Sequence, residues 1–108
     1  LELINEVLDL ARIESGRIDL SMEGVDIAAL GEDCRQLIQP IADRAGIRLE
    51  IDLPAGQAVF ADRVRLKQVL LNLLSNAVKY NRPAGHVRLH AGEGRPGRLR
   101  LVVADSGP

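Results

Sequence analysis

The segment between residues 62 and 80 constrains this chain most, because it reads as one long helix that is apolar on two sides. Asp62 is a suitable N-cap, and Asn81, Pro83 and Gly85 end the pattern. At about 100° per residue, the broad face predicted to pack on a sheet holds Leu66, Val69, Leu70, Leu73, Leu74 and Ala77. A narrower apolar line, which predicts cover on a second side, holds Val64, Leu71 and Val78.

A polar stripe separates these two apolar sides. It consists of Arg65, Gln68, Asn72, Asn76 and Lys79. Such a stripe has to face water, a ligand or an ion. Asn amide oxygens suit Mg²⁺ and its ordered water, and a Lys ammonium one turn further on suits a phosphate. The same spacing also allows that the two Asn side chains satisfy nearby backbone groups and that Lys79 is only exposed.

The other patterns predict an α+β chain. Apolar residues at spacings of three and four predict a bundle-type helix over 1–14, which Ser15 and Gly16 end. A second helix is predicted over about 27–45, and Pro40 should bend it or weaken one turn. Alternation predicts strands at 47–53, 58–60, 86–91 and 98–104, with a short one possible within 17–25. We therefore expect a two-layer α/β sandwich that follows a helix of another unit.

Composition limits the classes of function. The chain has 108 residues, a net charge of −1 and a single cysteine, Cys34, which excludes a disulfide framework and fits a reducing compartment. Its two aromatic residues, Phe60 and Tyr80, make a protein that stacks nucleic-acid bases a poor match. No apolar run approaches the roughly 18 residues of a membrane span, which predicts a soluble chain. Residues 61–108 hold nine basic and three acidic residues, which suits an anionic ligand but equally describes a solvated surface.

Three segments carry a resemblance to a known family. The stretch LKQVLLNLLSNAVKYNRPAG (66–85) resembles the N-box of the sensor histidine kinases of two-component systems. LELINEVLDLARIESG (1–16) is similar to the end of their dimerisation and phosphotransfer domain, and VVADSGP (102–108) to the entry into their G1 box. The implied fold is the two-layer ATPase sandwich that these kinases share with gyrase, the Hsp90 chaperones and MutL-type ATPases.

The resemblance also implies roles for six residues, with ATP and Mg²⁺ as cofactors. Asn76 would be the main residue directed at Mg²⁺, Asn72 would support the metal and phosphate network, and Lys79 would pair with phosphate. Tyr80 would lie against the nucleotide. Asp105 would accept a hydrogen bond from the adenine amino group, and Gly107 would let the backbone approach the nucleotide without a Cβ clash.

The implied domain division is uneven. Residues 1–16 would end the dimerisation helix, 17–26 would be a linker with a possible first strand, and 27–108 would be the N-terminal part of the catalytic ATP-binding domain, cut within the G1 box. His86 and His90 lie outside the context of the family's phosphoacceptor histidine and are expected at the surface. The ATP lid and the G2 box lie beyond Pro108. We therefore expect weak or no binding of Mg-ATP by these 108 residues, and no catalytic residue among them.

The function implied for the longer protein is protein-histidine kinase activity. The γ-phosphate would pass to a histidine and then to a response regulator aspartate, within a cytoplasmic homodimer that upstream sequence could anchor in the inner membrane. The isolated piece is expected to self-associate, through its first helix, an open sheet edge or a swap of elements. Two alternatives remain open, an ATP-gated ATPase of the chaperone or topoisomerase type and a non-catalytic dimerisation module.

Overall fold

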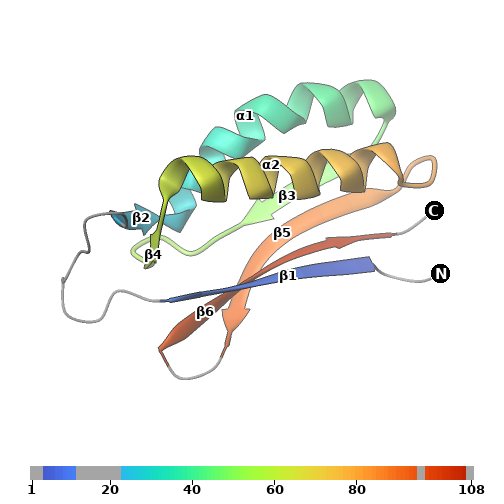
Figure 1. The fold of residues 1–108 in the computed structure, drawn as a ribbon. Helices are drawn as coiled ribbons and strands as arrows, with labels where there is room; N and C mark the ends of the chain where they lie inside the picture. The colour runs from blue at the N-terminus through green and yellow to red at the C-terminus, as the bar shows by residue number, and fades with distance from the viewer. Residues whose placement is uncertain (1–3, 12–22, 95–96, 107–108) are drawn as a thin grey trace.

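The computed structural model describes residues 4–11, 23–94 and 97–106. In chain order its elements are β1 (Ile4–Ala11), β2 (Glu23–Asp26), α1 (Ile27–Ala45), β3 (Arg48–Asp52), β4 (Ala58–Ala61), α2 (Arg63–Lys79), β5 (His86–Glu93) and β6 (Arg98–Asp105). The two helices lie over one face of a four-stranded sheet of order β1-β6-β5-β3, and β2 pairs with β4 in a small second sheet (Figure 1). The expected α+β two-layer sandwich is confirmed.

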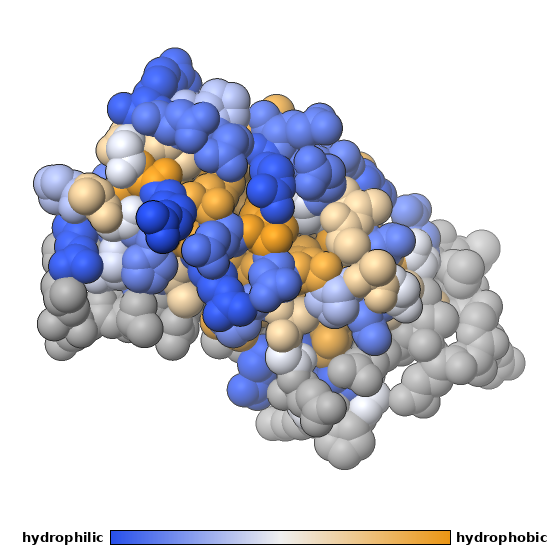
Figure 2. Space-filling model, turned by 180° about the vertical axis from the view of Figure 1, so that it is seen from behind, coloured by the Kyte–Doolittle hydropathy of each residue, from blue (hydrophilic) through white to orange (hydrophobic). Residues whose placement is uncertain are grey.

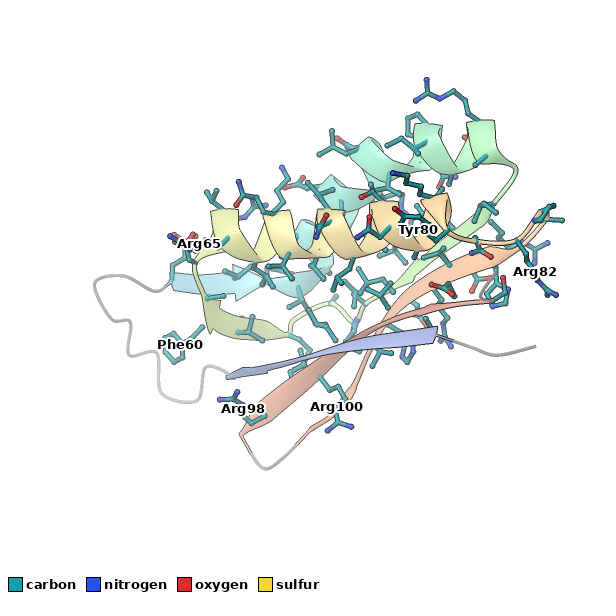
Figure 3. All side chains as sticks on the ribbon, turned by 45° about the vertical axis from the view of Figure 1, so that its right-hand side comes forward. Phe60, Arg65, Tyr80, Arg82, Arg98 and Arg100 are labelled. Carbon is teal, nitrogen blue, oxygen red and sulfur yellow. The ribbon has the colours of Figure 1, made fainter. Side chains whose placement is uncertain are left out.

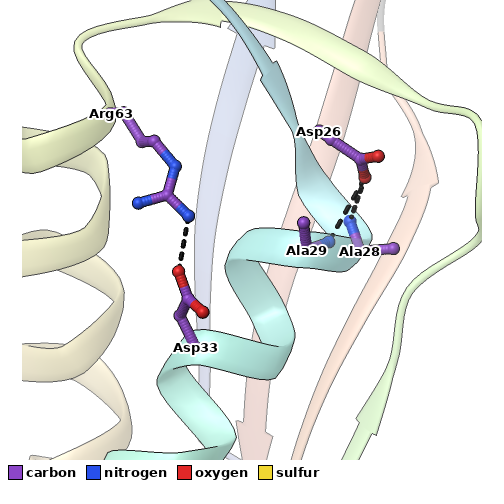
Figure 4. A network of polar contacts seen from close by, with 5 residues as sticks. All are labelled: Asp26, Ala28, Ala29, Asp33 and Arg63. Carbon is purple, nitrogen blue, oxygen red and sulfur yellow. Dashed lines mark hydrogen bonds and ion pairs between the residues drawn. The ribbon is translucent and has the colours of Figure 1, made fainter.

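Both ends of α1 are fixed by the residues that flank it. Asp26 Oδ1 accepts hydrogen bonds from the backbone N–H groups of Ala28 and Ala29, at 3.0 and 3.2 Å (Figure 4). Gly46 ends the helix at φ 70°, a left-handed conformation that favours glycine. The predicted span of 27–45 is confirmed, and the helix continues through Pro40, which is exposed. Its buried residues are Ile27, Leu30, Gly31, Cys34, Ile38 and Ala42.

The second helix follows its predicted limits. Asp62 caps α2 by accepting from the N–H groups of Val64 and Arg65, at 3.1 and 3.2 Å. The Arg63 guanidinium then bonds the Asp33 carboxylate of α1, which ties the start of α2 to its neighbour (Figure 4). The residues that α2 buries are Leu66, Leu70, Leu74, Ala77 and Val78.

Two expectations about the apolar sides of α2 need correction. Val64 is 67% exposed and Val69 is 42% exposed, whereas both were predicted to be covered. Leu71 and Leu73 are half-buried. The residues that do become buried lie towards α1 and the sheet, and the elements packed against α2 are too few to enclose a helix that is apolar over so wide an arc.

The main sheet has one face towards the helices and one face away from them. Along β6 the buried residues alternate, as Leu99, Leu101, Val103 and Asp105. Figure 3 shows Arg98 and Arg100 on the side of the sheet away from the helices. Viewed from behind, apolar side chains show between hydrophilic ones near the middle of the molecule, so the core is incompletely covered there (Figure 2).

Residues 4–11 form a strand, and the helix predicted over 1–14 is wrong for them. β1 runs antiparallel along β6, from Ile4 opposite Asp105 to Ala11 opposite Arg98. Ile4, Leu8 and Leu10 fit a period of two as well as a helical period. Pairing with an otherwise open edge of β6 then decides between the two, because tertiary pairing overrides local helical preference. The division of the chain at residue 16 stays a prediction, and most of the linker lies outside the described residues.

Neither of the helices in the described ranges is long and apolar enough to cross a bilayer.

Candidate functional site

The predicted polar stripe lies on the solvent side of α2. Its members Arg65, Gln68, Asn72, Asn76 and Lys79 are all exposed. Within the described part of the chain, the side chains of Asn72 and Asn76 make no hydrogen bond, so their amide groups are available to a ligand. The alternative that these amides satisfy nearby backbone therefore finds no support.

Lys79 and Tyr80 form a pair at the C-terminal end of this stripe. Lys79 Nζ lies 5.2 Å from the centroid of the Tyr80 ring, within the range of a cation–π contact. Tyr80 is 63% exposed and lies at the last turn of α2 (Figure 3). Its backbone N–H bonds the carbonyl of Asn76 at 2.9 Å, so the ring is held one turn after the second asparagine.

Asp105 lies on a different element, as the last residue of β6. It is 8% exposed and occupies the helix-facing side of the sheet, in line with the buried Leu101 and Val103. It lies opposite Val87 of β5. A carboxyl group in so buried a position needs polar partners, and Asp105 has them. Gly107, the sixth predicted residue, lies outside the described residues.

These residues fit a Mg²⁺-nucleotide in their chemistry. The amide oxygens of Asn72 and Asn76 are hard, neutral ligands without another partner in the described part, and Lys79 adds a cation one turn away. In the same part, no cluster of three or more His, Cys, Asp or Glu side chains could hold a metal ion. A magnesium ion at this site would accordingly depend on asparagine oxygens, water and the phosphates of its ligand.

Sequence reasoning missed two further polar residues beside this site, Asn81 and Ser106. The sequence predicts Asn81 only as one of the residues that end the helix, and it assigns no role to Ser106. The hydroxyl of Ser106 donates to Asn81 Oδ1 at 2.8 Å, although the two residues are 25 positions apart. The one available signal was their position, each directly after a predicted site residue.

A pocket of about 580 Å³ lies elsewhere, on the outer side of β3 and β5. Its lining residues are Gly46, Arg48, Glu50, Ala84, Gly85, His86 and Arg88. None of the predicted nucleotide residues lines it, and its lining contains neither an asparagine amide nor a lysine. The chemistry of a magnesium nucleotide therefore points to the α2 stripe and Asp105 rather than to this pocket.

The two histidines lie on the outer face of β5. His86 is exposed and His90 is half-buried, which confirms the surface placement of His86 and partly that of His90. Both belong to β5, in agreement with the strand predicted at 86–91.

Comparisons with known proteins show the family to which the chain belongs. A family model described as "Histidine kinase-, DNA gyrase B-, and HSP90-like ATPase" matches residues 61–108, which include α2 and Asp105. Histidine protein kinase DivJ of Caulobacter vibrioides is 42% identical over 108 residues, which cover 99% of this chain and 18% of that protein. This chain belongs to the histidine kinase ATPase family.

Other members of the histidine kinase ATPase family show the same likeness. The Non-motile and phage-resistance protein of Caulobacter vibrioides is 39% identical over 110 residues, which cover 99% of this chain and 13% of that protein. Full-length ShkA, solved in complex with AMPPNP, has a TM-score of 0.69 at 40% identity and covers 84% of this chain and 20% of its own. The catalytic domain of ThkA has a TM-score of 0.74 at 24% identity, covering 82% of this chain and 60% of its own, and supports the fold.

The chain spans less than a fifth of the length of both Caulobacter relatives, at 13% and 18%.

Proposed function

We propose that this chain is the ATP-binding part of a sensor histidine kinase and that its nucleotide lies between Asp105 and the part of the α2 stripe from Asn72 to Lys79. The observation that carries the proposal is the pair of unpartnered asparagine amides at 72 and 76, inside the segment that matches the family model. The AMPPNP complex of ShkA, 40% identical to this chain, supports an adenine nucleotide as the ligand.

Each of the six residues has one proposed task. Asn76 holds Mg²⁺ through its amide oxygen, Asn72 supports the metal and phosphates from one turn earlier, and Lys79 pairs with phosphate. Bound Mg²⁺ would neutralise charge on the phosphates. Tyr80 lies against the nucleotide. Gly107 leaves room for it beside the backbone.

Asp105 is proposed to select the base. A carboxylate accepts a hydrogen bond from the amino group of adenine and repels the carbonyl that guanine carries at the same position. Its burial at the end of β6 supports this task, because a hydrogen bond shielded from water discriminates more strongly than an exposed one.

The longer protein is proposed to transfer the γ-phosphate of ATP to a histidine of a dimerisation domain and then to a response regulator aspartate. ThkA has been solved in complex with the response regulator protein TrrA, which supports such a partner. The chain's own part in the transfer would be to bind and orient ATP. A homodimer of the longer protein and a cytoplasmic position for this part complete the proposal.

The 108 residues alone are proposed to be inactive. His86 and His90 both lie on the strand β5 and not on a helix that could present them as a phosphoacceptor. We propose weak or no binding of Mg-ATP by this piece and its self-association. Calorimetry that found low-micromolar binding of Mg-ATP would contradict the first statement, and light scattering that found a monomer at high concentration would contradict the second.

The proposed site is tested by a phosphotransfer assay on the longer kinase. We expect Asn76→Ala and Asp105→Ala each to lower the rate by roughly 100-fold or more, a size typical of a lost transition-state or binding contact. Gln68→Ala is the matched control, because Gln68 shares the exposed stripe but lies one turn before Asn72. Wild-type rates for both site variants would overturn the assignment.

A further inference from the structure

Two segments that are distant in the sequence are joined at the C-terminal end of α2. One is the turn after the helix (81–85) with the start of β5 that follows it, and the other is the end of β6. Ser106 Oγ donates to Asn81 Oδ1 at 2.8 Å and accepts from the backbone N–H of His86 at 3.1 Å. Asn81 Nδ2 donates to the carbonyl of His86 at 3.0 Å, and the N–H of Ser106 donates to the same carbonyl at 3.2 Å.

We call this group of hydrogen bonds the Asn81–Ser106 clamp. Its members satisfy one another at a buried point, since Ser106 is 3% exposed and Asn81 is half-buried. Loss of either side chain would leave a buried polar group without its partner, which costs more than the bond itself contributes. The clamp is therefore a fixed joint and not a chance surface contact.

Gly85 provides the space that the clamp needs. A Cβ at residue 85 would lie 2.2 Å from Asn81 Oδ1 and 2.5 Å from Ser106 Oγ, closer than any real contact. Any other residue would thus push apart the two atoms that share the central hydrogen bond. Ala84, just before it, has φ 58°, a left-handed conformation that costs free energy in a non-glycine residue. The turn is held in a strained shape that fits the clamp.

The position of the clamp connects the two halves of the proposed nucleotide site. Asn81 directly follows Tyr80, and Ser106 directly follows Asp105. We propose that Asn81 and Ser106 are positioning residues that fix the adenine-accepting Asp105 relative to Lys79 and Tyr80 at the end of α2. This inference rests on the proposed function, because it assumes that Asp105 binds the base.

The test compares ATP with inosine triphosphate on the longer kinase. Inosine triphosphate carries a carbonyl where ATP carries the amino group, so the ratio of the two dissociation constants reports the contact made by Asp105. We expect Ser106→Ala and Asn81→Ala each to lower the preference for ATP about tenfold, the size of one lost hydrogen bond. The double variant should lose no more than either single one, because both disrupt one joint.

Ser75→Ala is the matched control. Its hydroxyl makes a local bond to the carbonyl of Asn72 at 3.2 Å and takes no part in the clamp, so the preference for ATP should stay at the wild-type level. A variant that only unfolds more readily lowers the apparent affinities for both nucleotides equally and leaves their ratio unchanged. The ratio therefore separates a positioning role from a purely structural one.

The two proposals fail in different ways. If the wild-type kinase shows no preference for ATP, or if Asp105→Ala keeps it, the proposed function is wrong and the positioning role falls with it. If Asp105→Ala loses the preference while Ser106→Ala and Asn81→Ala keep it, only the positioning role is overturned.

Discussion

The reactivity of the Cys34 thiol is set by its position in the core. It is fully buried at 0% exposure on the inner side of α1, and this burial raises the pKa of its thiol, with Lys67 and Arg63 opposing the rise only in part. A thiol reacts as the thiolate. Burial therefore slows the reaction of Cys34 in two ways, because reagents cannot reach the sulfur and because the raised pKa keeps it protonated.

We expect Cys34 to react with a thiol-specific reagent at least roughly 100-fold more slowly in the folded chain than in denaturant. The measurement is the rate of colour release from Ellman's reagent at pH 8, with and without denaturant. The unfolded chain is its own control, because it contains the same single thiol. Equal rates in both states would show that this part of the core is open.

Those parts of the candidate site that belong to one continuous motif could be predicted from the sequence. The contacts between residues that are distant in the sequence could not. Asn72, Asn76 and Lys79 stand at helical spacing, so their common exposed side follows from the 3.6-residue period. The burial of Asp105 follows from the alternation of β6. The bond between Asn81 and Ser106 depends on the packing of a turn against a strand end, which no local pattern encodes.

At the scale of elements, the contact between Arg63 and Asp33 joins the two helices. The Arg63 guanidinium holds the pKa of the Asp33 carboxyl below its usual range, chiefly through their hydrogen bond. The folded pKa is thus lower than the unfolded one. The pair therefore stabilises the fold above the ordinary carboxyl pKa, and this contribution is lost as the pH falls through the folded pKa.

We expect Asp33→Asn to lower the free energy of unfolding slightly at pH 7 and to have a smaller effect below about pH 4. Denaturant unfolding of both proteins across this pH range measures the difference. Glu32→Gln is the control, since it removes an exposed pair with Arg35 within α1 and leaves the contact between helices intact. A difference that grew towards low pH would contradict the sign argued here.

Pro40 offers a second test on α1. It lies inside the helix, on the exposed side, where it provides no N–H for the carbonyl of Gln36. We expect Pro40→Ala to raise the free energy of unfolding by about 1–3 kcal/mol. Alanine favours the helix more than proline does, and this gain is partly offset because proline restricts the unfolded chain. Thermal unfolding checks this, with exposed Gln36→Ala expected within about 0.5 kcal/mol of the parent. A destabilised Pro40→Ala variant would mean that the ring is needed for packing.

The limits of sequence reading are also visible at this scale. The spans of α1 and α2 follow from caps and breakers, and both were predicted to within a residue or two. The segment at 4–11 was not, because its apolar positions fit both periods and the deciding partner, β6, lies at the other end of the chain.

For the whole molecule, β1 is the strand that closes one edge of the main sheet. Every residue of β6 has a partner in β1, and on its other side β6 pairs with β5. A chain without residues 1–11 would present β6 as an unprotected edge with alternating apolar residues.

We expect deletion of residues 1–11 to lower stability and to increase self-association, because the free edge of β6 can pair with another copy. Light scattering over a range of concentrations measures the association, with the full 108-residue chain as the reference. The Arg98→Pro variant of the shortened chain, which removes one backbone N–H from β6, should associate less. A shortened chain that remained as monomeric and as stable as the full chain would show that β1 contributes nothing to the sheet.

The pairing of β1 with β6 also sets an order of events during protein synthesis. β1 is synthesised before residues 12–97, and its partner strand is synthesised only after them. At roughly 5–20 residues per second, this interval lasts on the order of ten seconds. During that time the backbone of β1 lacks its partner strand and is available to chaperones and to neighbouring nascent chains. The pairing of β1 with β6 therefore forms late.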